Sequence, residues 1–362
     1  MIKAAVMSAP DEPIEVREYA LPELEPGAVL LRTVYSEVCG TDVHLHHGQL
    51  SGVPYPIIPG HVSVGLVEGT AGEVIDVNGD VLHQGDVVTF LDVHETCGRC
   101  WYCLVAKAST RCPQRKVYGI TYSAGEGLLG GWSQAIYLKP GVKVIKLPES
   151  LSPEQFISAG CGLPTAVHAL ERAEVKLGDT VVVQGSGPVG LCAAILAQLS
   201  GAMEIIVIGS PKLRLNMAQA VGADHVIDVG ESTPADRIAR VRELTHWRGA
   251  DVVIEATGNP AAVLEGMQMV RDAGRYVIVG QYTDAGTVTV NPHLDINRKH
   301  LEVRGCWGTD FSHVYRGIRV LAKHAQRFGF ERFISRMYGL EETNQALADV
   351  ENLRVIKAVI KP

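Results

Sequence analysis

A glycine-rich loop near the middle of the chain constrains the fold more than any other feature. The loop reads Gly185-Ser186-Gly187-Pro188-Val189-Gly190, after an apolar run at 180–184 and before a helical pattern at 189–199. In such a G-x-G-x-x-G loop the first glycine makes a tight turn, the second lets the backbone approach a pyrophosphate, and the third lets the helix pack closely on the strand. A bare glycine-rich turn is the alternative, but the flanking pattern favours a dinucleotide site. The candidate contacts of NAD or NADP here are Gly185, Gly187, Pro188, Val189 and Gly190.

The region around this loop alternates apolar strands with helical patterns from about residue 163 onward. This alternation is typical of βαβ units, so it predicts an α/β fold with a parallel sheet. The predicted strands are 180–184, 205–208, 252–255 and 276–279, and the predicted helices are 189–199 and 212–221.

An acidic residue that binds the ribose is expected about 20 residues after the loop. The chain reads Ile208-Gly209-Ser210-Pro211-Lys212 there and carries no acid. This removes a partner for the 2′-hydroxyl group and also a repulsion against a 2′-phosphate, to which Ser210, Lys212 and Arg214 are candidate donors. Lys212 and Arg214 are equally compatible with solvated helix positions, so NAD and NADP both remain open.

The composition indicates a globular, soluble protein. With 362 residues, 46% of them apolar and 20% charged, the chain is long enough for two packed domains. The net charge of -7 and the lack of a basic block argue against a nucleic-acid partner. We expect no membrane partner and a cytoplasmic location, since no apolar run approaches the ~20 residues of a span and the start does not resemble a signal peptide.

Four of the eight cysteines lie within sixteen residues, in the sequence Cys97-Gly98-Arg99-Cys100-Trp101-Tyr102-Cys103 and then Cys112. In a reducing compartment clustered cysteines are more often metal ligands than disulfides. Thiolates at this spacing can close a tetrahedral zinc site with no open position, which predicts a structural zinc. Four unrelated buried thiols are the alternative.

The first 150 residues predict an irregular, mostly β domain, because short β-branched runs such as 62–67 and 86–90 alternate with turn residues. After about residue 300 the chain shows Val303-Arg304-Gly305, a helical stretch at 311–328 and an apolar strand at 355–360. We expect this last segment to rejoin the first domain.

Three short motifs place cysteine and histidine far apart in the sequence. They are Cys39-Gly40-Thr41-Asp42-Val43-His44, then Pro59-Gly60-His61, and later Cys161-Gly162-Leu163-Pro164-Thr165. Spacing alone is weak evidence here, since a single cysteine or histidine is more often structural than a ligand. Together with the four-cysteine segment, the glycine loop, Gly85-Asp86-Val87-Val88, Gly130-Gly131-Trp132-Ser133 and Ile356-Lys357-Ala358-Val359-Ile360, their order resembles the zinc-containing medium-chain alcohol dehydrogenase family over almost the whole chain.

The resemblance implies a GroES-like, mostly-β catalytic domain at 1–162 and 302–362, and a Rossmann doubly wound parallel sheet at 163–301. It also implies two zinc ions per chain. Cys39, His61 and Cys161 would hold the catalytic zinc and leave one position open, which is the set of two cysteines and one histidine found in alcohol dehydrogenases. Polyol dehydrogenases of the family usually place a carboxylate near the last of these ligands, so Cys161 favours simple or cyclic alcohols.

The resemblance also implies roles for residues around the metal and the cofactor. Thr41 matches the hydroxyl that first accepts the substrate proton, and His44 matches the histidine that passes it to solvent. An ordinary surface histidine is the alternative for His44. Asp42 matches a carboxylate that orients His61. Thr165 and Lys357 match cofactor contacts, the latter as a cation near the pyrophosphate.

The chain departs from the family at two places. The usual Gly-His-Glu is here Gly60-His61-Val62, so a carboxylate that can tune the zinc or serve as a transient ligand is missing. Eight residues separate Cys103 from Cys112 where seven are common, which predicts a bulge of one residue but still a closed site.

The sequence therefore predicts a zinc-dependent dehydrogenase that transfers a hydride between a small-molecule alcohol, or its carbonyl product, and NAD or NADP. Secondary, cyclic, sugar and amino alcohols all remain open as substrates, and relatives are homodimers or homotetramers. Two other functions compete with this one. A zinc-free reductase of the same fold would not need Cys39, His61 and Cys161 together, and a non-catalytic binding protein would tolerate the loss of Thr41 or Cys39.

Overall fold

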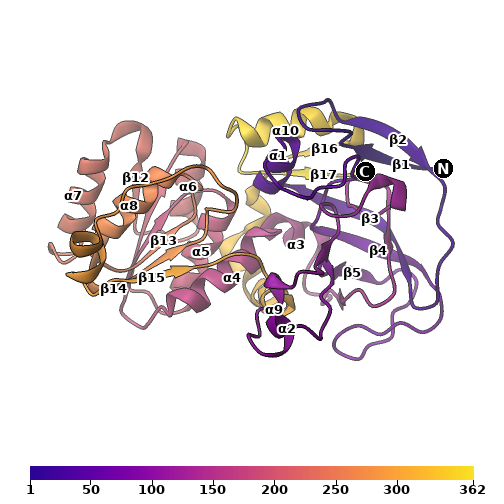
Figure 1. The fold of residues 1–362 in the computed structure, drawn as a ribbon, viewed down its shortest axis with the longest axis horizontal. Coiled ribbons are helices and arrows are strands. Elements are labelled where there is room, and N and C mark those ends of the chain that lie inside the picture. Colours follow the sequence, from indigo (N-terminus) through magenta and orange to yellow (C-terminus); the bar gives the residue numbers. More distant parts are fainter. The chain divides into compact units, whose positions relative to one another are not determined.

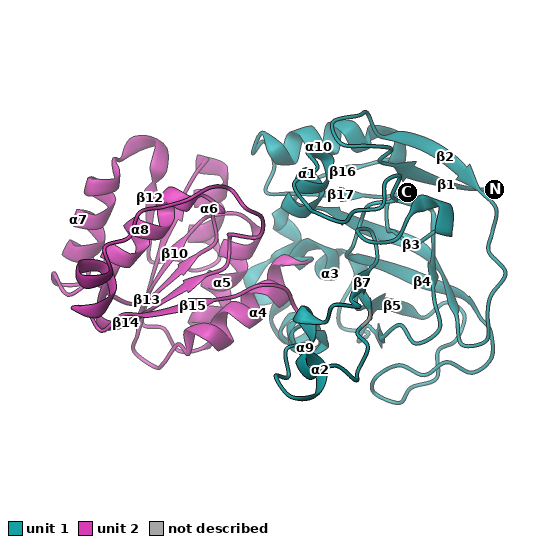
Figure 2. Cartoon of the chain, in the orientation of Figure 1, with its two compact units in different colours: residues 1–160, 310–362 teal, residues 161–309 magenta. Residues whose placement is uncertain are grey.

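The computed structural model describes residues 1–362, except for the side chain of Glu95. The chain forms two compact units, which Figure 2 shows in separate colours. Unit 1 comprises residues 1–160 and 310–362, and unit 2 comprises residues 161–309. Unit 1 is therefore assembled from both ends of the chain.

Unit 2 is built on a six-stranded, fully parallel sheet with the strand order β12-β11-β10-β13-β14-β15 (Figure 1). In chain order this is the 3-2-1-4-5-6 arrangement of a doubly wound dinucleotide-binding fold, as the sequence predicts. Its strands are β10 (Thr180–Gln184), β11 (Glu204–Gly209), β12 (His225–Asp228), β13 (Ala250–Glu255), β14 (Val270–Ile278) and β15 (Glu302–Gly305). Its helices are α4 (Gly162–Ala173), α5 (Pro188–Leu199), α6 (Lys212–Ala220), α7 (Pro234–Leu244) and α8 (Pro260–Met269).

The burial of the strands in the core of unit 2 explains why their sequences are unbroken apolar runs. Val182 on β10, Ile206 on β11 and Val253 on β13 are 0% exposed and belong to one apolar cluster. Strands of a parallel sheet covered by helices are buried on both faces, so alternation of polar and apolar residues is not needed. The predicted strand 180–184 coincides with β10, and the helix predicted at 212–221 ends one residue early, at Ala220.

The predicted boundary between the domains at residue 302 differs from the structure. Residues 302–309 were predicted to belong to the first domain, whereas β15 pairs in parallel with β14 and extends the sheet of unit 2. The boundary therefore lies after Thr309. Val303 is the only apolar residue among the four of β15, so no pattern in the sequence indicates that this short edge strand continues the sheet.

Unit 1 centres on a seven-stranded sheet with the order β16-β17-β3-β4-β5-β9, with β8 also paired to β3. Its strands are β1 (Ile2–Val6), β2 (Glu15–Tyr19), β3 (Val29–Val38), β4 (Ser63–Thr70), β5 (Val87–Phe90), β6 (Val93–Glu95), β7 (Lys116–Val117), β8 (Ala135–Leu138), β9 (Val144–Lys146), β16 (Ile334–Tyr338) and β17 (Lys357–Ile360). Its α-helices are α1 (Gly40–His46), α2 (Trp101–Leu104), α3 (Pro153–Ala159), α9 (Phe311–Phe328) and α10 (Thr343–Glu351). The mostly-β character agrees with the sequence prediction, and the helix predicted at 311–328 coincides with α9. None of the described helices combines the length and apolarity needed to cross a membrane.

A buried ion pair joins two helices of unit 2 and yields a stability prediction. Arg237 on α7 donates two hydrogen bonds of 2.7 Å to Glu265 on α8, and both residues are less than 10% exposed. Glu265→Gln leaves the guanidinium buried without a counter-charge, so the free energy of unfolding should fall by about 3 kcal/mol. Chemical denaturation of unit 2 measures this loss.

Arg240 and Glu243 supply the matched control on α7, since this pair is exposed at both ends. Glu243→Gln should change the free energy of unfolding by less than about 0.5 kcal/mol. Equal effects of the two substitutions would show that burial does not govern the strength of these pairs.

Candidate active site and metal centres

The end of β3 brings the candidate ligands Cys39 and His61 together. Cys39 follows the last residue of β3, and His61 lies two residues before β4. Because β3 and β4 pair antiparallel with Ser36 opposite Ser63, the segments beyond these two positions lie side by side. On the other side of β3, β17 pairs with Ala358 opposite Val38, which places Lys357 at the same edge.

Helix α1 positions the thiol of Cys39. Cys39 is the N-cap residue, and its Sγ accepts a hydrogen bond from the Thr41 backbone N–H at 3.3 Å. The Asp42 carboxylate accepts the backbone N–H of Cys39 at 2.9 Å and completes a capping box. The helix start therefore holds Cys39 in one orientation.

Close packing of glycines holds His61 in place. Gly60 has a φ of +89°, and a Cβ there would lie 2.5 Å from Ser36 Oγ. A Cβ at Gly131 would lie 1.8 Å from Ser63 Oγ, and one at Gly130 would lie 1.8 Å from the Ile58 carbonyl oxygen. No side chain larger than hydrogen fits at these positions, which gives a physical reason for the Gly130-Gly131 motif beside the histidine segment.

The donor atoms of Glu37, Cys39, His61 and Cys161 all lie within 4.8 Å of one another. Cys161 directly follows Gly160, the last residue of the first segment of unit 1. The Nε2 atom of His61 lies 3.9 Å from Cys39 Sγ and 3.8 Å from Glu37 Oε1. Sulfur, imidazole nitrogen and carboxylate oxygen are the donors that zinc takes in proteins, so this set fits a zinc ion.

The electrostatics of this site also favour a cation. Burial alone would lower the pKa of His61, but Cys39, Asp42 and Glu37 raise it well above its ordinary value. Burial raises the pKa of Asp42 well above its ordinary value, and Cys39 adds to the rise. Cys39 Sγ and Glu37 Oε1 thus lie close to His61 Nε2, and a metal ion there would supply a positive charge that their anionic forms attract.

The predicted relay residues lie on α1, where Thr41 and His44 are three residues apart and share a face. The Nδ1 atom of His44 bonds Gln49 Oε1. The structure gives no hydrogen bond from His61 to Asp42 among the described residues, and both His61 Nδ1 and Asp42 Oδ1 are buried without a hydrogen-bond partner. Asp42 therefore acts on Cys39 in this structure, and its predicted orientation of His61 stays a prediction.

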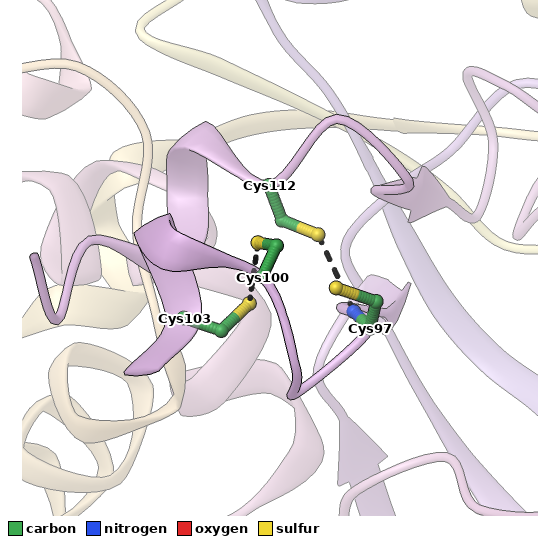
Figure 3. Close-up of side chains that lie close together, drawn as sticks. All are labelled: Cys97, Cys100, Cys103 and Cys112. Atoms are coloured by element: carbon green, nitrogen blue, oxygen red, sulfur yellow. Dashed lines mark hydrogen bonds between the residues drawn. The ribbon is translucent and has the colours of Figure 1, made fainter. Parts of the chain in front are cut away.

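The four clustered cysteines form the second candidate metal centre (Figure 3). Their four Sγ atoms lie within 4.8 Å of one another, and Cys112 Sγ accepts the backbone N–H of Cys97 at 3.3 Å. The long gap before Cys112 includes Lys107, whose φ of +52° marks a left-handed turn. The thiols meet despite the extra residue, so the set fits a closed zinc site.

The thiols of this cluster differ in how readily they ionise. A hydrogen bond from the Arg99 backbone lowers the pKa of Cys97 to about 6, with help from Cys100 and Cys112. Burial and the neighbouring Cys100 raise the pKa of Cys103 to about 12. Cys97 therefore ionises more readily than Cys103, and a bound dication would favour the deprotonated form of its thiol ligands.

In unit 2 the glycine loop has the geometry that its motif predicts. Gly185 has a φ of +114°, which makes the tight turn after β10. Gly187 is the N-cap of α5, and a Cβ at Gly190 would lie 1.9 Å from the Gly185 carbonyl oxygen. Pro188 and Val189 open α5, whose free backbone N–H groups can bind an anion.

The remaining predicted cofactor contacts lie at the start of two helices. Ser210 follows β11, where its carbonyl oxygen accepts the Ser186 hydroxyl at 3.1 Å. Lys212 is exposed and pairs with Glu231 at 2.6 Å. Arg214 is buried, burial lowers its pKa, and its Nη1 lies 3.7 Å from where a Cβ at Gly187 would be. Thr165 lies in the first turn of α4.

The chain matches two family models, the alcohol dehydrogenase GroES-like domain over residues 25–149 and the zinc-binding dehydrogenase over residues 188–323. A 5-exo-hydroxycamphor dehydrogenase of Pseudomonas putida is 34% identical over 361 residues, which cover 99% of this chain and 98% of that protein. The chain belongs to the zinc-containing medium-chain alcohol dehydrogenase family. It is therefore an oxidoreductase that acts on alcohols.

Solved structures of the family share the whole fold. An alcohol dehydrogenase of Thermotoga maritima has a TM-score of 0.94 and 34% identity, with 100% of this chain and 99% of that chain covered. A Sinorhizobium meliloti protein solved with bound NADP has a TM-score of 0.85 and 25% identity, with 100% of this chain and 99% of that chain covered. The prediction of a zinc-containing medium-chain alcohol dehydrogenase is confirmed.

Glu37 and Lys357 form a contact at the Cys39 site that the sequence did not predict. Glu37 was not predicted as a site residue, because valine at position 62 was taken to leave no carboxylate beside the zinc. Lys357 is 1% exposed, and its Nζ bonds Glu37 Oε2. Its predicted contact with a pyrophosphate stays a prediction. The sequence feature that could have indicated Glu37 is its position two residues before the candidate ligand Cys39.

The four-cysteine cluster yields a prediction about stability. Cys100→Ser removes one thiolate from the cluster, so the chain should lose one zinc ion and melt at a lower temperature. Metal analysis and thermal unfolding measure the two effects. Cys306→Ser is the control, since Cys306 is a buried thiol of unit 2 outside both clusters, and its zinc content should equal that of the unmodified protein. Full zinc content in the Cys100 variant would contradict the assignment.

Proposed function

We propose that this protein is a zinc-dependent alcohol dehydrogenase that transfers a hydride between a secondary or cyclic alcohol and a nicotinamide dinucleotide, with two zinc ions per chain. The observation that carries the proposal is the convergence of Cys39, His61 and Cys161 donor atoms within 4.8 Å. The four-cysteine cluster supports the second zinc, and the glycine loop of unit 2 supports the dinucleotide. Each of these three features fits one part of the chemistry.

A catalytic zinc supplies Lewis acidity, which lowers the pKa of an alcohol hydroxyl and favours loss of its proton. Cys39, His61 and Cys161 would hold that ion. The Thr41 hydroxyl would accept the proton, and His44, on the same face of α1, would pass it to solvent. The backbone N–H groups at the start of α5 would bind the pyrophosphate and keep the nicotinamide in position.

The proposed substrate class rests on two observations. Cys161 occupies the ligand position where polyol dehydrogenases of the family usually have a carboxylate nearby, which favours alcohols without neighbouring hydroxyl groups. The Pseudomonas putida relative, which covers 99% of this chain, acts by its name on a hydroxycamphor, an alcohol on a cyclic carbon skeleton. A secondary or cyclic alcohol fits both.

We propose NADP as the preferred cofactor. A Cβ at Gly209 would lie 2.3 Å from Ser186 Oγ, so the position at the end of β11 has no room for a ribose-binding carboxylate. Arg214 and Lys212 lie just beyond it as candidate donors to a 2′-phosphate. The solved Sinorhizobium meliloti relative is bound to NADP.

We also propose that the protein forms a homodimer or homotetramer in the cytoplasm. Four apolar side chains on and beside α2 are between 43% and 63% exposed, and an apolar patch of this kind is typical of a surface that meets another protein. They are Trp101, Tyr102, Leu104 and Val105. A reducing compartment would keep the clustered cysteines available as metal ligands rather than as disulfides.

The metal ligand Cys39 tests the proposal against its rivals. Cys39→Ser should lose about one zinc per chain and at least about a thousandfold in kcat, since Lewis-acid stabilisation contributes several kcal/mol. NADP binding should persist, because the glycine loop belongs to unit 2. Zinc analysis, cofactor titration and initial rates with cyclic and secondary alcohols, with NADP and NAD, measure these effects.

A zinc-free reductase would keep its turnover in this variant, and a non-catalytic protein would show none even when unmodified. Near-normal activity in Cys39→Ser would therefore overturn the proposed function. A higher rate with NAD than with NADP in the unmodified protein would overturn only the cofactor preference.

The proposed relay predicts a change in pH dependence. In His44→Gln the proton must reach solvent without the imidazole, so the pH at which alcohol oxidation reaches half its maximal rate should move upward. Initial rates measured across the pH range show the shift. His293→Gln, an exposed histidine of unit 2, is the control and should leave the profile unchanged. An identical profile for His44→Gln would remove this residue from the relay.

A further inference from the structure

A carboxylate lies at the Cys39 site although position 62 carries valine. Glu37 is 0% exposed, and its Oε1 lies 3.8 Å from His61 Nε2. Its backbone N–H donates to the Val62 carbonyl at 3.1 Å, so positions 37 and 62 are neighbours across the two strands. A side chain at either position therefore starts from the same edge of the sheet, beside the histidine.

The distances around His61 match those of a single metal ion. A tetrahedral zinc with bonds of about 2.0–2.3 Å places its ligand atoms about 3.3–3.8 Å apart. His61 Nε2 lies 3.8 Å from Glu37 Oε1 and 3.9 Å from Cys39 Sγ, which is close to that range. The Glu37 oxygen thus lies at nearly the same distance from His61 Nε2 as the sulfur of Cys39 does.

The second oxygen of Glu37 is held from the other side. Oε2 accepts a bond from Lys357 Nζ, and both side chains are almost fully buried. A Cβ at Gly160 would lie 1.6 Å from this oxygen and 2.3 Å from the Lys357 nitrogen. The backbone of Gly160 therefore confines the pair, and the carboxylate has one oxygen toward Lys357 and the other toward His61.

A purely structural ion pair between β3 and β17 is the alternative explanation. Such a pair would need only one oxygen of Glu37, whereas the second oxygen lies beside the nitrogen of His61 and among the other candidate ligand atoms. The charges favour a metal instead: a dication, the thiolates of Cys39 and Cys161, the Glu37 carboxylate and the Lys357 ammonium sum to zero. A neutral set costs least to bury.

We propose that Glu37 is the fourth protein ligand of the metal ion at the Cys39 site in the substrate-free protein, and that Lys357 is a positioning residue that holds its other oxygen. This inference rests on the proposed function, because it requires a metal ion on Cys39, His61 and Cys161. Glu37 then supplies from β3 the carboxylate that Val62, the residue before β4, cannot supply.

The rate of metal loss tests the proposal without using activity. Glu37→Gln should release metal from the Cys39 site to a chelator about tenfold faster or more than the unmodified protein, because one ligand is lost. The cobalt(II)-substituted protein should also change its visible absorption, which reports the ligand set. The four-cysteine cluster contributes equally to both proteins and cancels in the difference spectrum.

The double variant Glu37→Gln/Lys357→Met separates a ligand from a structural ion pair, since it removes both charges and leaves side chains of similar size. If Glu37 is a ligand, the double variant should have a melting temperature close to that of the unmodified protein and should still lose metal about tenfold faster or more. The proposal would be overturned if the double variant had the metal release rate and the cobalt spectrum of the unmodified protein. That result would show that the effects of Glu37→Gln came only from leaving the Lys357 charge without a partner.

Cys39→Ser in the same chelator assay distinguishes the two levels of inference. A Cys39 variant with two zinc ions and unchanged release would mean that the proposed function fails. A Cys39 variant that lacks the metal, beside a Glu37 variant with the release rate and spectrum of the unmodified protein, would mean that only the role of Glu37 fails.

Discussion

The antiparallel pairing of β3 with β4 and β17 is the constraint on which the active centre of unit 1 depends. It sets Ser36 opposite Ser63 and Val38 opposite Ala358, so segments around residues 39, 61 and 357 meet at one edge. Backbone hydrogen bonds of a sheet define this register, and a slip by one residue would turn every side chain to the other face. The geometry of the candidate ligands thus depends on sheet register as well as on the local capping box at Cys39.

The same edge concentrates polar groups that are costly to bury. Glu37, Asp42, His61 and Lys357 are each less than 7% exposed, and His61 Nδ1 and Asp42 Oδ1 have no hydrogen-bond partner among the described residues. Buried charges contribute little net stability even when paired. The two apolar clusters of unit 1 must therefore stabilise it, and the proposed metal ion would add to that stability because it would balance charges already present.

The accuracy of the sequence prediction follows the range of the interactions involved. The Gly185–Gly190 loop, the thiol cluster and α9 depend on residues close in sequence, and their patterns predict them well. The edge strand β15 and Glu37 were missed because each depends on a distant partner. β15 is defined by its hydrogen bonds to β14, and Glu37 by the pairing of β3 with β17. Lys357 was predicted as a site residue, but no pattern near it could indicate Glu37 as its partner.

The bond between Glu37 and Lys357 spans 320 positions in the chain, which has a consequence for synthesis. A ribosome adds about 5–20 residues per second, so Glu37 emerges roughly 15–60 s before the lysine that balances its charge. During that interval the nascent first segment holds an unneutralised carboxylate beside two ligand side chains, and unit 2 folds behind it. If the proposed metal ion satisfies this charge, it would be able to bind before β17 exists, and the last strand would then close over a centre that is already loaded.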